Sequence, residues 1–185
     1  MKKIIAISGG KGTGKDTIAD YICNKYCCRK YAFADPLKEL AEKIFKFSKE
    51  LLWGPSENRD VSIAQFNGLT PRKVLETFGD AGRACYPNIW AELTIQNISQ
   101  YTVGHFNGVV ISDLRMRNEL DIVKKHGGIV IRIKRENKKN TSTHNSETEQ
   151  KTIPDSDFDY VIDNNKDIKH LHDQIDSIMK NIIIL

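Results

Sequence analysis

The chain has 185 residues, 39% of them apolar, which indicates one globular domain with a hydrophobic core and leaves too little for two large domains. The net charge of +4 is too small to indicate nucleic-acid binding by itself, because bound nucleotide phosphates explain it equally well. No apolar run approaches the roughly 20 residues of a membrane span. No secretory signal is recognisable before the first strand, so we expect a cytoplasmic location and no membrane partner.

A glycine-rich segment follows the first predicted strand, residues 4–7. Residues 9–15 fit the template G-x-x-x-x-G-K, and the apolar spacing of residues 18–26 predicts a helix directly after them. Strand, glycine-rich turn and helix together predict a phosphate-binding loop, whose N–H groups and helix N-terminus attract anions. Lys15 supplies a compact charge for the outer phosphates of a nucleoside triphosphate. Asp16 stands where the template has Ser or Thr, and Thr17 follows one residue later.

The cysteines show no spacing typical of a zinc site. Cys23, Cys27 and Cys28 fall on the first helix and its end, and Cys85 lies far from them in sequence. We therefore expect reduced thiols that mostly serve packing.

The next predicted elements are a short strand, residues 31–34, and a helix that opens at Asp35. Asp35 suits the N-cap and Pro36 suits the first helical position. A second interpretation stays open for Asp35, since strand ends beside a phosphate loop border the active site of α/β proteins. Residues 52–68 are predicted to be irregular, as in a mobile loop over a site.

Two further helices are predicted before the next strand. Thr70 and Pro71 open the first of them as N-cap and first helical residue, and Gly79 and Gly82 are expected to interrupt it. The second helix is marked by the apolar spacing of residues 90–101.

The apolar run 109–112 predicts a strand buried on both faces, and Asp113 follows it. A carboxylate at this position resembles a Walker B aspartate, which holds magnesium directly or through water. The alternative is an N-cap for the next helix, which contains residues 120–123 and is closed by the glycine pair 127–128. A strand over residues 129–133 comes next.

Residues 134–152 have almost no apolar content and should not pack into the core. Their basic start suits a lid that closes on phosphates, and a disordered surface loop is the alternative. Ser146 and Glu149 have capping-box spacing, so a short helix is expected to begin there, while a lone His144 predicts no metal site. The last strand is predicted over residues 158–162, and the last helix has an apolar stripe from Ile168 to Ile182.

Alternating strands and helices predict an α/β fold with helices on both faces of a parallel sheet of four or five strands. The function is less constrained, because many nucleotide-binding proteins share a phosphate loop. The guanine-reading sequence Asn-Lys-x-Asp is absent, which argues against a GTPase. Arginines instead occur in loops and at element ends, where they could clamp the phosphates of two nucleotides during phosphoryl transfer. They are Arg59, Arg72, Arg83, Arg115 and Arg135.

Several segments in the same order along the chain resemble the bacteriophage deoxynucleoside monophosphate kinases. The Gly-Lys-Asp-Thr ending of the loop is typical of that family, so Asp16 departs only from the general template. The other similar segments are 33–38, 70–90, 110–119, 127–135 and 161–164, and residues 144–147 resemble part of the family's lid.

The resemblance implies a single P-loop kinase domain over residues 1–185, with three α/β/α layers, an acceptor-binding region at about 35–101 and a lid at about 134–152. It implies transfer of a phosphoryl group from ATP to a deoxynucleoside monophosphate (dNMP), with Mg²⁺. It also implies a homodimer and no stable nucleic-acid partner, and a location in the host cytoplasm if the protein is phage-encoded.

The resemblance also implies roles for individual residues. Lys15, Arg115 and Arg135 would stabilise the transferred group, and Asp16 or Thr17 would hold magnesium, with Asp113 behind them. ATP would contact Gly10, Lys11, Gly12, Thr13, Gly14, Lys15, Asp16, Thr17 and Asn164. The acceptor would contact Asp35, Lys38, Arg59, Arg72, Gly79, Arg83 and Trp90.

Two alternatives remain open from the sequence. The Gly-Lys-Asp and Ala-Asp-Pro-Leu-Lys patterns also resemble phosphomevalonate kinases, so another small-molecule kinase, including a dephospho-coenzyme A kinase, would fit. A module that binds nucleotide or nucleic acid without catalysis is the other alternative.

Overall fold

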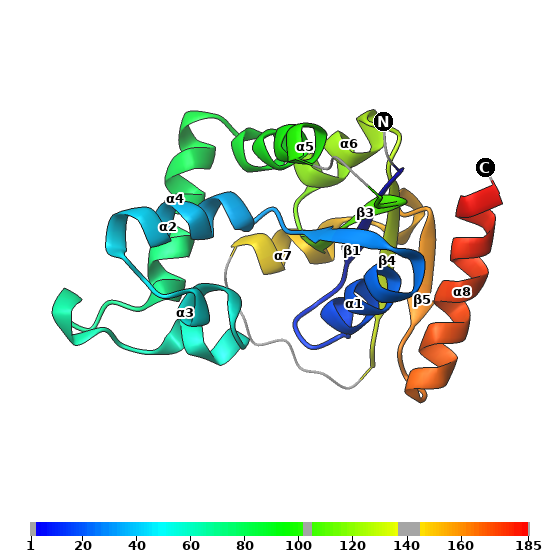
Figure 1. Ribbon diagram of the computed structural model, residues 1–185, viewed down its shortest axis with the longest axis horizontal. Coiled ribbons are helices and arrows are strands. Elements are labelled where there is room, and N and C mark those ends of the chain that lie inside the picture. Colours follow the sequence, from blue (N-terminus) through cyan, green and yellow to red (C-terminus); the bar gives the residue numbers. More distant parts are fainter. Residues whose placement is uncertain (1–2, 102–104, 137–144, 185) are drawn as a thin grey trace. The chain divides into compact units, whose positions relative to one another are not determined.

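The computed structural model describes residues 3–101, 105–136 and 145–184. They form α-helices, 3-10 helices and strands, most of which are labelled in Figure 1. The strands are β1 (Lys3–Ser8), β2 (Cys28–Tyr31), β3 (Gly108–Leu114), β4 (Ile129–Lys134) and β5 (Tyr160–Asp163). The α-helices are α1 (Lys15–Tyr26), α2 (Asp35–Phe45), α3 (Lys49–Trp53), α4 (Pro71–Cys85), α5 (Ile89–Tyr101), α6 (Arg117–Lys125), α7 (Asn145–Thr152) and α8 (Ile168–Ile184). The 3-10 helices are η1 (Ser56–Asp60), η2 (Ala64–Phe66) and η3 (Asp155–Asp157).

The chain divides into two compact units. The first contains residues 1–32 and 97–185, and the second contains residues 33–96. The second unit nearly coincides with the predicted acceptor-binding region. A single kinase domain over the whole chain stays a prediction.

A parallel sheet of five strands organises the first unit, with the order β2-β3-β1-β4-β5. This confirms the predicted parallel sheet. β1 lies at its centre, and Ile5 pairs with Val110 of β3 on one side and with Ile129 of β4 on the other. Because the strands are parallel, the segments that follow β1 and β3 leave the same edge of the sheet, where α/β proteins bind their ligands.

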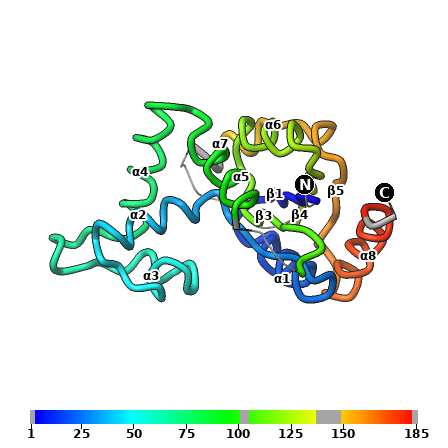
Figure 2. Tube along the Cα trace, turned by 45° about the horizontal axis from the view of Figure 1, so that its top comes forward, coloured from blue at the N-terminus to red at the C-terminus, as the bar shows by residue number. Residues whose placement is uncertain are grey.

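Both faces of this sheet are covered, as the continuous apolar strands predict. Figure 2 shows α6 above the strands and α1 below them. One core joins the sheet to α1 and α8 and includes Ile5, Ile18 and Ile175, each 2% exposed or less. On α6, Leu120 and Val123 are equally buried. The sheet is therefore the middle layer of a three-layer α/β/α arrangement.

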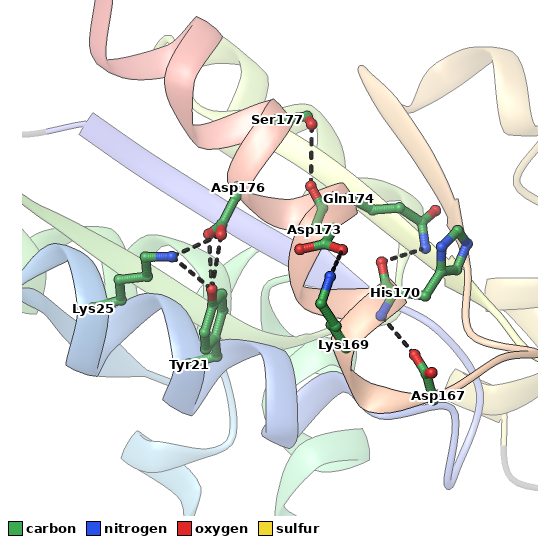
Figure 3. A network of polar contacts seen from close by, with 9 residues as sticks. All are labelled: Tyr21, Lys25, Asp167, Lys169, His170, Asp173, Gln174, Asp176 and Ser177. Carbon is green, nitrogen blue, oxygen red and sulfur yellow. Dashed lines mark hydrogen bonds and ion pairs between the residues drawn. The ribbon is translucent and has the colours of Figure 1, made fainter.

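Asp176 links the two helices that cover one face of the sheet (Figure 3). Its carboxylate accepts hydrogen bonds from the hydroxyls of Tyr21 (2.9 Å) and Tyr26 (2.7 Å) and from Lys25 Nζ (2.7 Å), all on α1. Tyr21 also stacks on His172 of α8 at 3.7 Å between ring centroids. Burial alone would raise the pKa of Asp176, but these hydrogen bonds outweigh it and hold the pKa at about 2.

The second unit has its own apolar core. Ala41, Phe47, Leu52 and Val74 are buried, and they are surrounded by half-buried side chains of α2, α4 and the 50s–60s segment. The predicted irregular segment 52–68 is therefore wrong in part, because it contains the end of α3 together with η1 and η2. Its Leu52, Ile63 and Phe66 supply apolar contacts to that core.

Three expected boundaries differ from the structure. The strand predicted over residues 31–34 begins earlier, as β2, because Cys27 ends α1 with a positive φ of 53° and the chain turns at once into the sheet. Asp35 is the first residue of α2 and not its N-cap, which is Ala34. The last strand begins at Tyr160 and not at Phe158, since the 3-10 helix η3 precedes it and Phe158 is buried outside the ladder.

The helix from Pro71 is confirmed at its start, where Thr70 caps it by accepting a hydrogen bond from the Lys73 N–H at 3.2 Å. The predicted interruption is wrong, because α4 continues through Gly79 and Gly82 to Cys85. A Cβ on Gly82 would lie 2.3 Å from an atom of the Trp90 ring. The glycine therefore serves close helix packing and not a break in the helix.

The segment 134–152 was predicted to stay outside the core. Residues 137–144, with His144, lie outside the described part of the chain. The predicted short helix is present as α7. Its Gln150 is buried, with 5% exposure, so the expectation that the whole segment stays outside the core is wrong. Ile168, predicted to face the core, is 52% exposed. Within residues 3–101, 105–136 and 145–184, no helix has both the length and the apolar character needed to cross a bilayer.

Candidate nucleotide-binding site

The loop between β1 and α1 has the backbone of an anion-binding turn. Gly9, Gly12 and Gly14 have φ angles of 154°, 77° and 102°, which side-chain-bearing residues rarely adopt. A Cβ on Gly14 would lie 2.7 Å from Nδ2 of Asn164. Thr13 closes the turn, since its hydroxyl donates to the Gly10 carbonyl at 2.9 Å. The glycines therefore serve both the backbone curve and close packing.

Lys15 is the first residue of α1, and its side chain is folded over the loop. Its Nζ donates to the carbonyls of Gly9 (2.6 Å) and Gly10 (2.9 Å), and the residue is 8% exposed. An ammonium group has three hydrogens and can serve several acceptors at once. Lys15 therefore places a positive charge inside the loop.

Asn164 holds the loop from the far edge of the sheet. Its Nδ2 donates to the Thr13 carbonyl at 2.8 Å, and its own N–H donates to the Lys134 carbonyl at 2.8 Å. The residue is 8% exposed. Asn164 thus connects the turn after β5 with the phosphate loop.

A pocket of about 390 Å³ opens beside the loop. It brings together several residues that were predicted for ATP binding or catalysis, namely Gly12, Gly14, Lys15, Asp16, Thr17, Arg135 and Asn164. The sequence-based interpretation missed Lys166, Ile168 and Leu171, which complete the lining. Periodicity assigned Ile168 and Leu171 to the buried stripe of the last helix, and only the fold shows that this helix begins at the pocket.

The predicted magnesium ligands carry oxygen donors, as Mg²⁺ prefers. Thr17 and Asp16 line the pocket, and the exposed Asp16 carboxylate accepts from Lys30 Nζ at 3.1 Å. Asp113 lies within β3, and the following helix α6 has Met116 as its N-cap, so Asp113 is not the cap that the alternative interpretation allowed. Among the described residues no cluster of three or more His, Cys, Asp or Glu could hold a metal. This donor set fits a cation that is shared with nucleotide phosphates.

Glu119 is a buried carboxylate beside Asp113 and Arg115. Its Oε2 accepts from the N–H groups of Arg115 (2.7 Å) and Met116 (2.9 Å). Burial, together with the charge of Asp113, raises the pKa of Glu119 to about 7 against the effect of these hydrogen bonds. Glu119 therefore fixes the backbone at Arg115, one of the predicted catalytic residues. The sequence carried only half of a capping-box signal for this contact, because Glu119 is the third helical residue but Met116 is no usual N-cap.

The end of α7 is also fixed to the sheet of the first unit. Gln150 Nε2 donates to Ser8 Oγ (3.0 Å) and to the Leu114 carbonyl (3.2 Å). Arg132 of β4 donates to the carbonyls of Gln150 (2.9 Å) and Ile153 (2.7 Å). Neither contact could be predicted from the sequence, because a single Gln in a polar segment or a single Arg in an apolar strand does not indicate its partner.

The predicted acceptor residues Asp35 and Lys38 form an ion pair at 3.2 Å on the first turn of α2. The Lys38 ammonium also lies 5.8 Å from the centre of the Trp53 ring. Arg59 Nη1 donates to the Leu52 carbonyl at 3.0 Å. These contacts tie α2, α3 and η1 together.

Arg72 lies at the start of α4, and the carboxylate of Asp60 holds its side chain. Its Nε and Nη2 donate to the two oxygens of Asp60, the second at 2.9 Å, and Nη2 also donates to the Ser56 carbonyl at 3.0 Å. The hydrogen bond and charge of Asp60 raise the pKa of Arg72. The guanidinium is thus oriented by η1.

Gly79, Arg83 and Trp90 lie close together where α4 faces α5. Trp90 Nε1 donates to the Gly79 carbonyl at 3.0 Å, and a Cβ on Gly79 would lie 3.1 Å from Arg83 Nη2. Arg83 itself donates to Asp80 at 2.7 Å. The structure therefore brings these three predicted acceptor residues into one group within the second unit.

A family model described as deoxynucleotide monophosphate kinase matches residues 3–71 and 56–175. The chain belongs to the deoxynucleotide monophosphate kinase family. It is 35% identical over 96% of both chains to a protein of Acanthamoeba polyphaga mimivirus that provisionally carries the family's name. It is 23% identical to the deoxynucleotide monophosphate kinase of Enterobacteria phage T4, covering 96% of this chain and 99% of the phage protein.

Among solved structures, that of TT1252 from Thermus thermophilus is similar, with a TM-score of 0.50 and 12% identity over 97% of both chains. At this identity the likeness supports the fold alone. The resemblance noted from the sequence is therefore confirmed by the family model and its relatives, while the fold agrees with the predicted α/β arrangement.

Proposed function

We propose that the protein transfers the γ-phosphoryl group of ATP to a dNMP and forms a deoxynucleoside diphosphate. The match to the deoxynucleotide monophosphate kinase family over most of the chain carries this proposal. The pocket beside the phosphate loop supports this proposal, because two lysines, an arginine and loop glycines line a volume of about 390 Å³. Such a set suits the triphosphate of a nucleotide.

On the donor side, Lys15 and Arg135 would bind and neutralise the phosphates, while the loop glycines offer backbone N–H groups. Asn164, Lys166 and Ile168 line the pocket beyond the loop, and the half-exposed Ile168 offers an apolar surface to the nucleoside. Arg115, held through its N–H by Glu119, would add charge stabilisation during transfer.

Mg²⁺ would be held by Thr17 or Asp16 together with the nucleotide phosphates, with Asp113 behind them. When bound, it would neutralise charge that develops on the phosphate oxygens. The oxygen donors at these three positions fit this ion, as described above.

On the acceptor side, the proposal places the dNMP on residues of the second unit. Arg72 and Arg83 would hold its phosphate, because planar guanidinium groups bind phosphate oxygens in pairs. Lys38, Arg59, Asp35, Gly79 and Trp90 would complete the acceptor site. The carboxylates of Asp60 and Asp80 support this arrangement, since each orients one of the two arginines.

Alanine substitution of Arg72 or Arg83 tests the acceptor assignment. Each variant should lower kcat/KM for the dNMP by roughly 10- to 100-fold, the loss typical of a charged contact to phosphate, and leave the ATP dissociation constant almost unchanged. Arg117→Ala is a matched control, because Arg117 is an exposed residue of α6 that pairs with Asp121 and Asp157. Equal losses of ATP binding and dNMP use in folded R72A or R83A would contradict the assignment.

A panel of acceptors tests the reaction itself. ADP formation should depend on a dNMP and not on dephospho-coenzyme A or phosphomevalonate, which are the acceptors of the alternative kinases.

Three expectations from the sequence stay predictions. They are the homodimer, the cytoplasmic location and the lack of a stable nucleic-acid partner. Light scattering after size exclusion would test the first of them.

A further inference from the structure

Gln150 is a buried polar side chain that the proposed reaction does not use. It belongs to α7, and both hydrogens of its amide nitrogen have acceptors, Ser8 Oγ at 3.0 Å and the Leu114 carbonyl at 3.2 Å. Ser8 is fully buried and Leu114 is 0% exposed. A buried amide with both donors satisfied is a fixed contact and not a surface contact that exchanges with water.

The two acceptors lie at the carboxyl ends of neighbouring strands. Ser8 ends β1 and directly precedes the phosphate loop, while Leu114 ends β3 between Asp113 and Arg115. The pairing of β1 with β3 is regular from Lys3 to Ala6, but its register shifts before Ser8 pairs with Leu114. Gln150 therefore bonds to both strands at the place where their backbone ladder is irregular.

Gln150 is itself held in place from two sides. Its main-chain carbonyl accepts from Arg132 Nη2 at 2.9 Å, and the Arg132 side chain is 11% exposed. The neighbouring Glu149 accepts from the Arg117 N–H at 2.9 Å. The backbone of α7 is thus anchored to β4 and α6, while the side-chain amide of Gln150 reaches β1 and β3.

We propose that Gln150 is a positioning residue that sets the distance between the phosphate loop and the end of β3, from Asp113 to Arg115. The inference rests on the proposed function, because the proposed function assigns the loop to ATP phosphates and Arg115, which follows β3, to catalysis. Its physical basis is that misplacement of a reacting group by about 1 Å can cost roughly 100-fold in rate. Supporting residues that fix such distances need not touch the substrate.

The test replaces the amide with an apolar side chain of similar length, Gln150→Met. The control is Asn107→Leu, which removes an amide that donates to the Tyr26 carbonyl at 3.0 Å just before the other end of β3. Q150M should lower kcat by about tenfold or more and leave KM for ATP and for the dNMP within about threefold. N107L should keep kcat within about twofold of the unsubstituted protein, because it leaves the carboxyl edge of the sheet intact.

A Q150M variant that folds and keeps kcat within about twofold would overturn the inference, even where its thermal stability falls. Where Q150M does not fold, Ser8→Ala removes one acceptor in a smaller change, and an unaltered kcat for S8A would overturn the inference equally. A different result contradicts the proposed function, namely an unsubstituted protein that phosphorylates no dNMP. An active unsubstituted protein with an unaffected Q150M contradicts the positioning role alone.

Discussion

Lys15 is the residue to which the proposed function gives the largest part on the donor side. Its ammonium group is inside the loop, bonded to the Gly9 and Gly10 carbonyls. Lys15→Met removes the charge and keeps the length of the side chain, so kcat should fall by roughly 100- to 1000-fold, as for other groups that stabilise charge in a transition state. Steady-state kinetics measure this, with Lys124→Met of α6 as a surface control. A folded K15M with nearly unaltered kcat would show that the charge has no part in transfer.

Glu119 gives the protein a pH-dependent stability. Its pKa in the folded chain is about 7 instead of 4.5, so the folded state binds a proton more tightly than the unfolded state. The resulting stability is present below about pH 4.5 and is lost as the pH rises to about 7, by roughly 3 kcal/mol in total.

Glu119→Gln should remove this pH dependence while a side-chain oxygen still accepts from Arg115 and Met116. Denaturant unfolding of both proteins between pH 5 and pH 8, at about one-unit intervals, makes the comparison. Parallel stability curves for the two proteins would contradict a raised pKa.

At the scale of the elements, α4 is a helix in which a glycine is kept for packing. Helix propensity alone predicts that Gly82→Ala stabilises the protein by up to about 1 kcal/mol. The Trp90 ring would lie 2.3 Å from the new Cβ, so we expect G82A to destabilise instead, by roughly 1–3 kcal/mol.

Gly79→Ala is the matched variant on the same helix. Its Cβ would meet the mobile end of Arg83 at 3.1 Å, so its stability should change little or rise. Chemical denaturation distinguishes the two substitutions, and a G82A more stable than G79A would rule out the packing explanation.

One carboxylate, Asp176, adds polar contacts to the apolar core that α1 and α8 share. Asp176→Asn removes the charge that Tyr21, Tyr26 and Lys25 share, and the Tm should fall by roughly 3–8 °C near neutral pH. Because the folded pKa of Asp176 is depressed to about 2, its contribution is present above about pH 4 and is lost as the pH falls toward 2. Melting curves should therefore converge in acid, and a constant difference in Tm down to pH 2 would contradict this.

The sequence predicted the elements that rest on periodic apolar patterns or on a strong cap. The phosphate loop, α8 and the start of α4 at Thr70 belong to this group. Prediction from the sequence failed where a tertiary contact overrides local conformational preference. The sequence alone predicts that Gly82 interrupts a helix, whereas in the structure it makes room for the Trp90 ring. The polar segment around Gln150 predicts an exposed side chain, whereas in the structure Gln150 bonds to the ends of β1 and β3. The loop motif fixes the positions of the pocket residues from Gly12 to Thr17, and the family resemblance supplied Arg135 and Asn164. Ile168 was missed because its place depends on the orientation of a helix.

For the whole molecule, the proposed activity divides along the two compact units. The residues assigned to ATP and magnesium all belong to the first unit, and those assigned to the acceptor all belong to the second. Substitutions in one unit should therefore affect one substrate more than the other. The arginine variants of the second unit test this division, since they should impair dNMP use and leave ATP binding almost unchanged.

Transfer of a labelled phosphoryl group tests the central claim most directly. The protein is incubated with ATP carrying phosphorus-32 in the γ position and with each of the four dNMPs in turn, and the products are separated. We predict that the label appears in a deoxynucleoside diphosphate, in step with ADP formation, for at least one of the four acceptors. Label that stays on ATP or appears only as inorganic phosphate with all four, in a protein that binds ATP, would contradict the proposed function.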